Sequence, residues 1–358
     1  DNDNIHRGIH TLAVRATNAY EATRISVANF VNANETEEIV FTKGTTEGIN
    51  LVAQAYGRKF FQKGDEIIIS QLEHHSNIVP WQILCEQTGA ILRVIPINQK
   101  GELIIQDYEN LLSERTKLVA VNYISNSLGT INPVKEITNL AHQVGSIVLI
   151  DAAQAAPHQP LDVQDINCDF LCLSAHKMYG PTGVGALYGK RTLLESMDPY
   201  QGGGEMIKEV TFSKTTYNDI PYKFEAGTPN IADVIAFQKA IDFILELGYT
   251  FIHEHEEKLL NHANEQLLSI PGLIPFGQAK QKASVFAFNI EGIHPFDIGM
   301  WMDAKGIAVR TGHHCTQPLM DWYGIEGTVR ASMGVYNTIE EIDYFAEALM
   351  NTIKKFKK

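Results

Sequence analysis

Two polar residues follow apolar runs at positions where a bound cofactor could use them. Lys177 lies in the segment Ser174-Ala175-His176-Lys177, directly after the strand-like run 168–173. Asp151 ends the apolar run 146–150, one strand–helix–strand unit earlier. A lysine is rarely placed at the inner end of a buried strand without a partner. Together, an amine that can bind an aldehyde and a carboxylate that can keep a pyridine nitrogen protonated predict pyridoxal 5′-phosphate (PLP), held on Lys177 as a Schiff base. Taken alone, Asp151 could also simply cap a helix.

A turn into a helix offers a place for the phosphate group. Phe41 is followed by Thr42-Lys43-Gly44-Thr45-Thr46 and then by a helical pattern. Such a turn provides free backbone N–H groups, two hydroxyls and the positive end of the helix dipole, although a plain helix N-cap is the alternative. Further along, the glycines in 180–185 would let the backbone pass close to a bulky ring.

Two clusters of histidines fit the same site. The imidazole of His74, in Glu73-His74-His75-Ser76-Asn77, could stack on a flat cofactor ring. The later segment Arg310-Thr311-Gly312-His313-His314-Cys315 predicts an exposed nucleophile, because protonated His313 or His314 would favour the thiolate of Cys315. A zinc site is the rival interpretation, although neither cluster has the spacing of a self-contained finger; its ligands would be His74, His75, His313, His314 and Cys315. Cys85, Cys168 and Cys172 fall within helix or strand patterns and are predicted core residues.

Composition excludes several classes of protein. The chain has 358 residues, 44% hydrophobic and 20% charged, which is typical of a folded protein with two domains. A net charge of −13 argues against a nucleic-acid partner despite the basic tail 354–358, which suits a helix C-terminus. No apolar run approaches the roughly 18 residues of a membrane helix, and no signal peptide is evident. Four cysteines without a metal or disulfide pattern favour the cytoplasm.

Strand-like runs alternate with helical patterns from about residue 37 to 190. The runs cover 39–42, 65–70, 91–95, 118–123, 146–151, 170–174 and 184–188. Near-continuous apolar strands separated by helices predict an α/β fold with a mainly parallel sheet covered on both faces. The last two runs are close in sequence and are expected to be sheet neighbours.

A long helical pattern over 231–247 leads into a second region. This region has further helical patterns over 252–268, 295–305 and from 339 onward, and a strand pattern over 283–288. We therefore predict a large α/β domain over residues 1–242 and a smaller α+β domain over residues 243–358. The long polar stretch 202–222 is predicted to be a functional loop.

Together these motifs resemble the cysteine desulfurases, in the class V aminotransferase group of fold-type I PLP enzymes. The match runs from His6-Arg7-Gly8-Ile9-His10 to Arg330-Ala331-Ser332, and the form Arg310-x-Gly-His-His-Cys315 resembles the SufS-like group II branch. The resemblance implies a large PLP-binding domain with a mainly parallel seven-stranded sheet and a small C-terminal domain that carries the nucleophilic cysteine. It also implies a homodimer.

The resemblance also implies a role for each matching position. Lys177 would be the Schiff-base lysine, Asp151 the partner of the pyridinium, Gln154 a donor to the ring phenolate oxygen and His74 the stacking imidazole. The phosphate would be held by Thr45, Thr46, Ser174 and His176, with Gly227 and Thr228 helping from the other subunit. Arg330 would bind the substrate carboxylate, Asn126 would lie near cofactor and substrate, and Cys315 would form the persulfide.

Two departures from the family pattern stand out. The family carries some tens of residues upstream of His6, including a strand-like stretch that lines the active site, so we expect an incomplete chain or a more open pocket. Thr316 stands where the branch often has alanine, which is expected to alter the loop but not its chemistry.

The activity implied is transfer of sulfur from L-cysteine to Cys315, leaving L-alanine, with a SufE- or SufU-like carrier taking the sulfur toward iron–sulfur cluster assembly. The alternatives are a selenocysteine lyase, a cysteine-sulfinate desulfinase, a true class V aminotransferase, or a non-catalytic assembly or metal-binding protein that has kept the fold.

Overall fold

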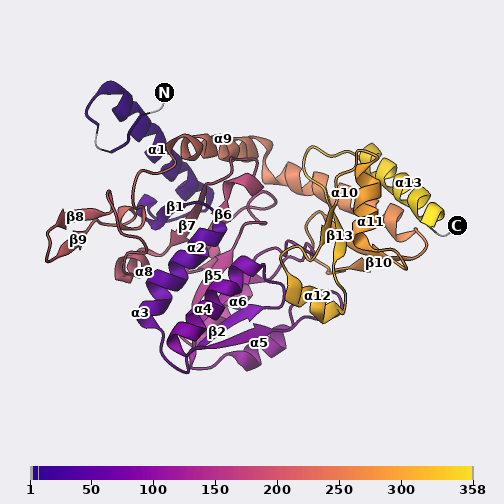
Figure 1. Ribbon diagram of the computed structural model, residues 1–358, viewed down its shortest axis with the longest axis horizontal. Coiled ribbons are helices and arrows are strands. Elements are labelled where there is room, and N and C mark those ends of the chain that lie inside the picture. The colour runs from indigo at the N-terminus through magenta and orange to yellow at the C-terminus, as the bar shows by residue number, and fades with distance from the viewer. Residues whose placement is uncertain (1–2, 7, 357–358) are drawn as a thin grey trace.

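A seven-stranded sheet forms the centre of the larger part of the molecule (Figure 1). The computed structural model describes residues 3–6 and 8–356, so Arg7 and the last two lysines of the basic tail lie outside the described residues. The strands are β1 (Ile39–Thr42), β2 (Glu66–Ser70), β3 (Ile91–Ile95), β4 (Thr116–Asn122), β5 (Ile147–Asp151), β6 (Phe170–Ser174) and β7 (Gly185–Gly189). They lie in the order β1-β7-β6-β5-β4-β2-β3. β7 is antiparallel to β1 and β6, and the other neighbouring pairs are parallel. The predicted mainly parallel sheet is therefore confirmed.

Helices cover both faces of this sheet. Alternate strand residues face opposite sides: Ile68 belongs to one apolar cluster, and Ile67 and Ile69 belong to the other. The first cluster is covered by α1 (Thr11–Phe30), α5 (Ile105–Leu111), α6 (Val134–Gln143), α7 (Val163–Ile166) and α9 (Ile231–Leu247). The second is covered by α2 (Thr45–Leu51), the π-helical turn Val52–Gly57, α4 (Val79–Thr88) and α8 (Arg191–Ser196), with α3 (Arg58–Phe60) following the π-helical turn. Because both faces are buried, these strands read as apolar runs rather than as alternating ones.

Three parts of this region differ from the sequence-based prediction. The run 91–95 does form a strand, but β3 lies at the edge of the sheet and is largely exposed. The 20-residue helix α1 was not predicted from the sequence. The stretch 202–222 is not wholly irregular, since β8 (Ile207–Val210) and β9 (Thr215–Tyr217) form a hairpin that projects away from the sheet (Figure 1).

The C-terminal part of the chain is built on a four-stranded antiparallel sheet with the order β10-β11-β13-β12. Its elements are α10 (Tyr249–Leu268), β10 (Leu273–Phe276), β11 (Val285–Ile290), α11 (Pro295–Asp303), β12 (Arg310–Gly312), α12 (Gln317–Tyr323), β13 (Thr328–Ser332) and α13 (Ile339–Phe356). This part lies on the side of the large sheet away from the β8–β9 hairpin (Figure 1). The predicted boundary after residue 242 falls inside α9, and the division into two domains remains a prediction. None of the helices in residues 3–6 and 8–356 is long and apolar enough to span a bilayer.

Candidate active site

The polar residues that follow the strands gather at one edge of the large sheet. In the register of β4 and β5, Asn122 lies opposite Asp151. Ser174, at the end of β6, pairs with Gly185 at the start of β7, and Gly185 also pairs with Thr42 at the end of β1. Parallel strands end at the same edge, which is where ligands bind in open α/β sheets.

Asp151 and Lys177 lie close enough to influence each other's protonation. Asp151 is 5% exposed, and its Oδ1 accepts a 2.9 Å hydrogen bond from Ala153 N–H. Burial raises the pKa of Asp151, and the positive charge of Lys177 partly offsets this. Burial likewise lowers the pKa of Lys177, which lies in the 3₁₀ turn Ala175–Lys177 after β6, with Asp151 opposing the shift. A lysine whose pKa is lowered more readily presents the neutral amine that attacks an aldehyde or accepts a proton.

The predicted phosphate turn is assembled where β1, β6 and β7 end. Gly44 precedes α2 with a φ of 142°, and Thr45 N–H donates to Ser174 Oγ at 2.8 Å. Ser174 Oγ in turn donates to Thr45 Oγ1 at 2.9 Å. A Cβ on Gly185 would lie 2.6 Å from Gly44 Cα, so glycine at this position permits a close approach of two backbones. Thr46 follows next in α2 and is exposed, as is His176, which follows Ala175 after β6.

His74 presents a neutral and fixed imidazole to this site. It follows β2, and its Nδ1 accepts a 3.1 Å hydrogen bond from Ser76 N–H. Burial, the positive charge of Lys177 and the nearby His75 and Arg310 lower the pKa of His74 to about 4. With Nδ1 as acceptor, the ring proton is on Nε2. The ring therefore has the flat, uncharged character that stacking on a cofactor requires.

A buried polar network that the sequence reasoning missed supports His74. Glu73 is 1% exposed, and its carboxylate accepts from the Ser70 hydroxyl, from Asn77 Nδ2 at 2.7 Å and from Asn122 N–H at 3.0 Å. Burial raises the pKa of Glu73 to about 8. The network joins the ends of β2 and β4 to the turn that carries His74, so it fixes the direction of that turn. The available signal was an acidic residue directly before the two histidines.

The Cys315 loop of the C-terminal part packs against the His74–His75 turn. His75 N–H donates to the Cys315 carbonyl at 2.8 Å, and Gln317 N–H donates to His75 Nε2 at 3.1 Å. His314 and Cys315 both have positive φ, 52° and 59°, which is uncommon for residues other than glycine. The half-buried thiol is thus carried on a constrained turn, and the charges of Lys177 and Cys315 influence each other.

The sequence analysis expected His313 or His314 to supply a positive charge for Cys315. The structure places His313 Nδ1 as the acceptor of a 3.1 Å hydrogen bond from Cys315 N–H, and His314 cannot supply the charge. Its Nε2 lies 2.9 Å from Thr328 Oγ1, and the residue is 2% exposed. Burial and the neighbouring Arg330 and Arg310 lower the pKa of His314 to about 3, so the ring stays neutral. The cation beside the thiol is Arg310, whose Nη2 lies 3.8 Å from Cys315 Sγ. Arg310 begins the motif 310–315, but the sequence analysis gives it no role.

Two arginines lie opposite each other in the small sheet. Arg310 on β12 and Arg330 on β13 are register partners, and like charges in such positions destabilise a sheet. Burial lowers the pKa of Arg330 to about 10, with Arg310 acting in the same direction. Arg330 Nη1 donates to the Asn126 carbonyl at 2.6 Å, and its buried Nε has no hydrogen-bond partner within residues 3–6 and 8–356. Asn126 Nδ2 donates to the His314 carbonyl at 2.8 Å. The pair leaves guanidinium donors for an anion such as a substrate carboxylate.

Some predicted residues lie outside this cluster. Gly227 and Thr228 line a cavity of about 150 Å³ with Thr42, Lys43 and Gly183, and Gly227 N–H donates to the Gly204 carbonyl at 3.0 Å. Within the described part of the chain, the hydrogen bond from Gly227 is to Gly204 and not to Lys177 or Ser174. Gln154 is half-buried in the turn that follows β5.

The residues present fit a phosphorylated pyridine aldehyde. A buried carboxylate, an amine with a lowered pKa, a flat neutral imidazole and a turn rich in hydroxyl and N–H groups lie around one edge of the sheet. Among the described residues the buried Nε of Arg330, on the small sheet, has no hydrogen-bond partner, and the charge of Arg330 acts on Lys177. The carboxylate suits the ring nitrogen, the amine the aldehyde, the imidazole the ring face and the turn the phosphate. The guanidinium suits the substrate carboxylate.

Comparison with known proteins decides the family. A family model described as aminotransferase class-V matches residues 1–345. The chain belongs to the class-V aminotransferase family. It is 50% identical to a "Probable cysteine desulfurase" of Halalkalibacterium halodurans, over 99% of this chain and 87% of that protein. It is also 50% identical to a cysteine desulfurase of Synechococcus elongatus, over 98% of this chain and 56% of that protein.

A solved structure of a member of this family has the same fold. The apo structure of a cysteine desulfurase from Thermococcus onnurineus superposes with a TM-score of 0.95 at 39% identity, over 99% of this chain and 88% of that one. These comparisons confirm the predicted family, the fold-type I architecture and the grouping of the chain with the cysteine desulfurases.

The other cysteines of this family member are structural. Cys168 and Cys172 are buried in or beside β6, where burial raises the pKa of both thiols. Cys85 is half-buried on α4, and burial raises its pKa as well. Across residues 3–6 and 8–356, no group of three or more His, Cys, Asp and Glu side chains is arranged to hold a metal ion.

Replacing Arg310 with glutamine is expected to slow alkylation of Cys315 by iodoacetamide at pH 7 by about 5- to 10-fold, because the thiolate loses the neighbouring positive charge. The rate is measured by mass spectrometry of the peptide that contains Cys315, and Cys85 in the same protein is the internal control. An unchanged rate, or a larger loss with His314→Gln, would show that Arg310 is not the cation that activates the thiol.

Proposed function

We propose that the chain is a PLP-dependent cysteine desulfurase, a transferase that converts L-cysteine to L-alanine and takes the sulfur onto Cys315. One observation carries this proposal: the Cys315 loop of the C-terminal part lies against the His74–His75 turn, within electrostatic reach of Lys177. A true aminotransferase would need the lysine and the aspartate but would have no use for a nucleophilic thiol at this place.

The cofactor would be held by residues from several strand ends. Lys177 Nζ would bond to the aldehyde, Asp151 would keep the ring nitrogen protonated, Gln154 would donate to the phenolate oxygen and His74 would stack on the ring. Thr45, Thr46, Ser174 and His176 would surround the phosphate. When bound, PLP supplies an electron sink for the charge that develops on the substrate.

The side chains of this chain would then bind the substrate and move protons and sulfur. Arg330 would bind the substrate carboxylate next to Asn126. Lys177 Nζ would take the Cα proton and return a proton to carbon. The Cys315 thiolate would attack the substrate sulfur, so that an S–S bond forms as the substrate C–S bond breaks. The C–S electron pair stays with carbon, which is protonated to give alanine, and Cys315 is left as a persulfide.

Two further features of the proposal concern other proteins. Gly227 and Thr228 are exposed or half-buried and lie away from the cluster around Lys177, which supports a homodimer in which they reach the phosphate of the other subunit. The half-buried thiol of Cys315 supports transfer of the persulfide sulfur to a SufE- or SufU-like carrier protein, and from there to iron–sulfur cluster assembly in the cytoplasm.

Product analysis with L-cysteine tests the proposed function. With PLP and a thiol reductant, the protein is expected to be yellow and to release alanine and sulfide in equal amounts. Keto-acid formation without sulfide would indicate an aminotransferase instead. Faster alanine formation from selenocysteine or cysteine sulfinate than from cysteine would favour the lyase or desulfinase alternatives. A colourless protein that is unchanged by borohydride would exclude a PLP enzyme.

A further inference from the structure

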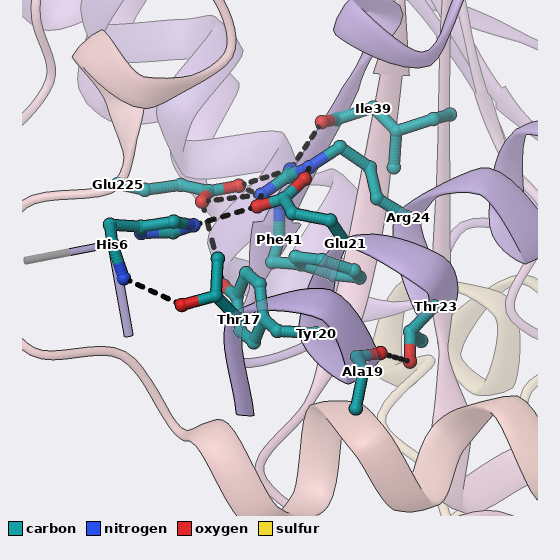
Figure 2. A network of polar contacts seen from close by, with 10 residues as sticks. All are labelled: His6, Thr17, Ala19, Tyr20, Glu21, Thr23, Arg24, Ile39, Phe41 and Glu225. Atoms are coloured by element: carbon teal, nitrogen blue, oxygen red, sulfur yellow. Dashed lines mark hydrogen bonds and ion pairs between the residues drawn. The ribbon is translucent and has the colours of Figure 1, made fainter. Parts of the chain in front are cut away.

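A buried arginine ties the first long helix to two segments that border the cofactor site (Figure 2). Arg24 on α1 has a side chain that is only 3% exposed, and its guanidinium contacts both oxygens of Glu225, from Nη1 at 2.7 Å and from Nη2 at 3.0 Å. Nη1 also donates to the Ile39 carbonyl at 2.8 Å, and Nε donates to Glu21 at 2.9 Å. The N–H donors of Arg24 therefore connect Glu225, the start of β1 and α1.

The carboxylate of Glu225 is equally constrained. Its side chain is 8% exposed, and besides Arg24 it accepts a 2.7 Å hydrogen bond from Phe41 N–H in β1. The Arg24 guanidinium lies 4.5 Å from the centroid of the Phe41 ring. Figure 2 shows Arg24, Glu225 and Phe41 together. We call Arg24 and Glu225 the α1–β1 clamp.

The clamp lies where two phosphate-binding segments begin. On one side, β1 ends one residue after Phe41 and continues into the Gly44–Thr45 turn, which contacts Ser174. On the other side, Gly227 follows Glu225 by two positions and has a φ of 80°. Thr42 and Lys43, which lead into that turn, line the same small cavity as Gly227 and Thr228. A single carboxylate therefore sets the distance between the turn that serves this chain's own phosphate site and the segment proposed to serve the other subunit.

A second acid, Glu21, also contacts the guanidinium of Arg24. Glu21 lies beside Arg24 and His6, with Glu21 Oε1 2.8 Å from His6 Nε2. Although burial alone would raise it, the hydrogen bonds from His6 and Arg24 lower the pKa of Glu21 to about 2. In a buried ion pair the attraction has to offset a large desolvation cost, so such a pair is weak evidence for stability and is better explained by the geometry it imposes.

We propose that Arg24 and Glu225 are positioning residues for the cofactor phosphate, and that they act by fixing the Gly44–Thr45 turn and the Gly227–Thr228 segment relative to each other. This inference rests on the proposed function, because it takes the phosphate of PLP as the ligand at both segments. Neither residue touches the reacting atoms.

Titration of the cofactor-free protein with PLP tests the clamp. The variants Glu225→Gln and Arg24→Met are expected to raise the dissociation constant for PLP by about 10-fold or more, since displacing a phosphate contact weakens binding by at least this factor. In the double variant the Arg24 and Glu225 charges are removed together, and Glu21 keeps its contact with His6, so the melting temperature is expected to recover toward that of the wild type while PLP binding stays weak. Recovery of stability without recovery of affinity separates positioning from a general loss of folding.

Asp169→Asn is the matched control. Asp169 is also a buried acid with an 8% exposed side chain, and it is paired with Lys190 at 2.9 Å and with His142 at 2.8 Å. It precedes β6, at the edge of the sheet opposite to Ser174. This variant is expected to lower stability and to leave PLP affinity unchanged.

The outcomes distinguish the inference from the function on which it rests. A wild-type protein that binds no PLP overturns the proposed function. A wild-type protein that binds PLP, with clamp variants that bind it equally well, overturns the positioning role alone, as does an equal loss of affinity in Asp169→Asn. If Arg24→Met does not fold, Glu225→Gln gives the same decision, because the amide oxygen still accepts from Phe41 N–H while the charge and the second oxygen, which accepts from Arg24 Nη2, are lost.

Discussion

Replacement of Lys177 by alanine is expected to abolish covalent attachment of PLP and to lower alanine production from L-cysteine by at least about 10³-fold. Burial lowers the pKa of Lys177, which makes its amine more available for attack on an aldehyde. In the proposed mechanism the same amine transfers the Cα proton. The measurement is borohydride reduction followed by mass spectrometry, which identifies the lysine that carries the cofactor, together with an assay for alanine.

A second lysine provides a stringent comparison. Burial lowers the pKa of Lys282 to about 8, so its amine is also reactive at neutral pH, but it lies near the Gly277 carbonyl rather than at the strand ends. Lys282→Ala is expected to leave the borohydride-fixed cofactor in place. If the label were found on Lys282, or persisted in Lys177→Ala, the assignment of the anchoring residue would be wrong.

The sequence was most informative where local signals agreed. The helix predicted over 231–247 is α9 to the residue, because its apolar periodicity is bounded by Asn230, whose side chain accepts from Asp233 N–H, and by Gly248 with a φ of 76°. Helix α1 gave no comparable signal. Its buried face includes Thr23 and Arg24, so the apolar repeat is interrupted at the positions that face the sheet. Arg24, which interrupts the apolar repeat of α1, is also the residue that forms the clamp with Glu225.

In the candidate site, the sequence predicted which residue types lie at the strand ends, but it did not predict the directions of their side chains. The strand-end positions of Asp151, Ser174 and Lys177 follow from the parallel sheet, and the structure brings them to one edge as predicted. Which of His313, His314 and Arg310 is the cation near Cys315 depends on side-chain direction. Thr328, on β13, lies 2.9 Å from His314 Nε2 through its Oγ1, and no local sequence pattern encodes that contact.

The register of β12 and β13 is a second feature that the sequence could not give. Arg310 and Arg330 are 20 positions apart, and only strand pairing brings them opposite each other. Their repulsion, and the unpaired Nε of Arg330, indicate a place for an anion next to the Cys315 loop. A carboxylate substrate would relieve that repulsion. This gives a physical reason for the carboxylate-binding role expected of Arg330.

Replacement of Cys315 by alanine is expected to abolish alanine formation from L-cysteine, with a loss of at least about 10³-fold, while the yellow cofactor-bound state persists. The thiol lies on a positive-φ turn of the C-terminal part, whereas the residues proposed to hold PLP lie on the large sheet. Losing the sulfur atom therefore removes the sulfur acceptor and leaves the cofactor site unchanged. The measurement pairs an alanine assay with an absorption spectrum of the same sample.

Cys85→Ala is the matched control for this variant, because Cys85 is the other half-buried thiol and lies on α4. It is expected to retain activity, and labelling with a persulfide-selective reagent after exposure to L-cysteine is expected to mark Cys315 in this protein. Alanine and sulfide at the parental rate from Cys315→Ala would rule out Cys315 as the nucleophile. Activity retained on selenocysteine but lost on cysteine would indicate a lyase, because selenium leaves carbon more readily and does not need the thiolate to accept it.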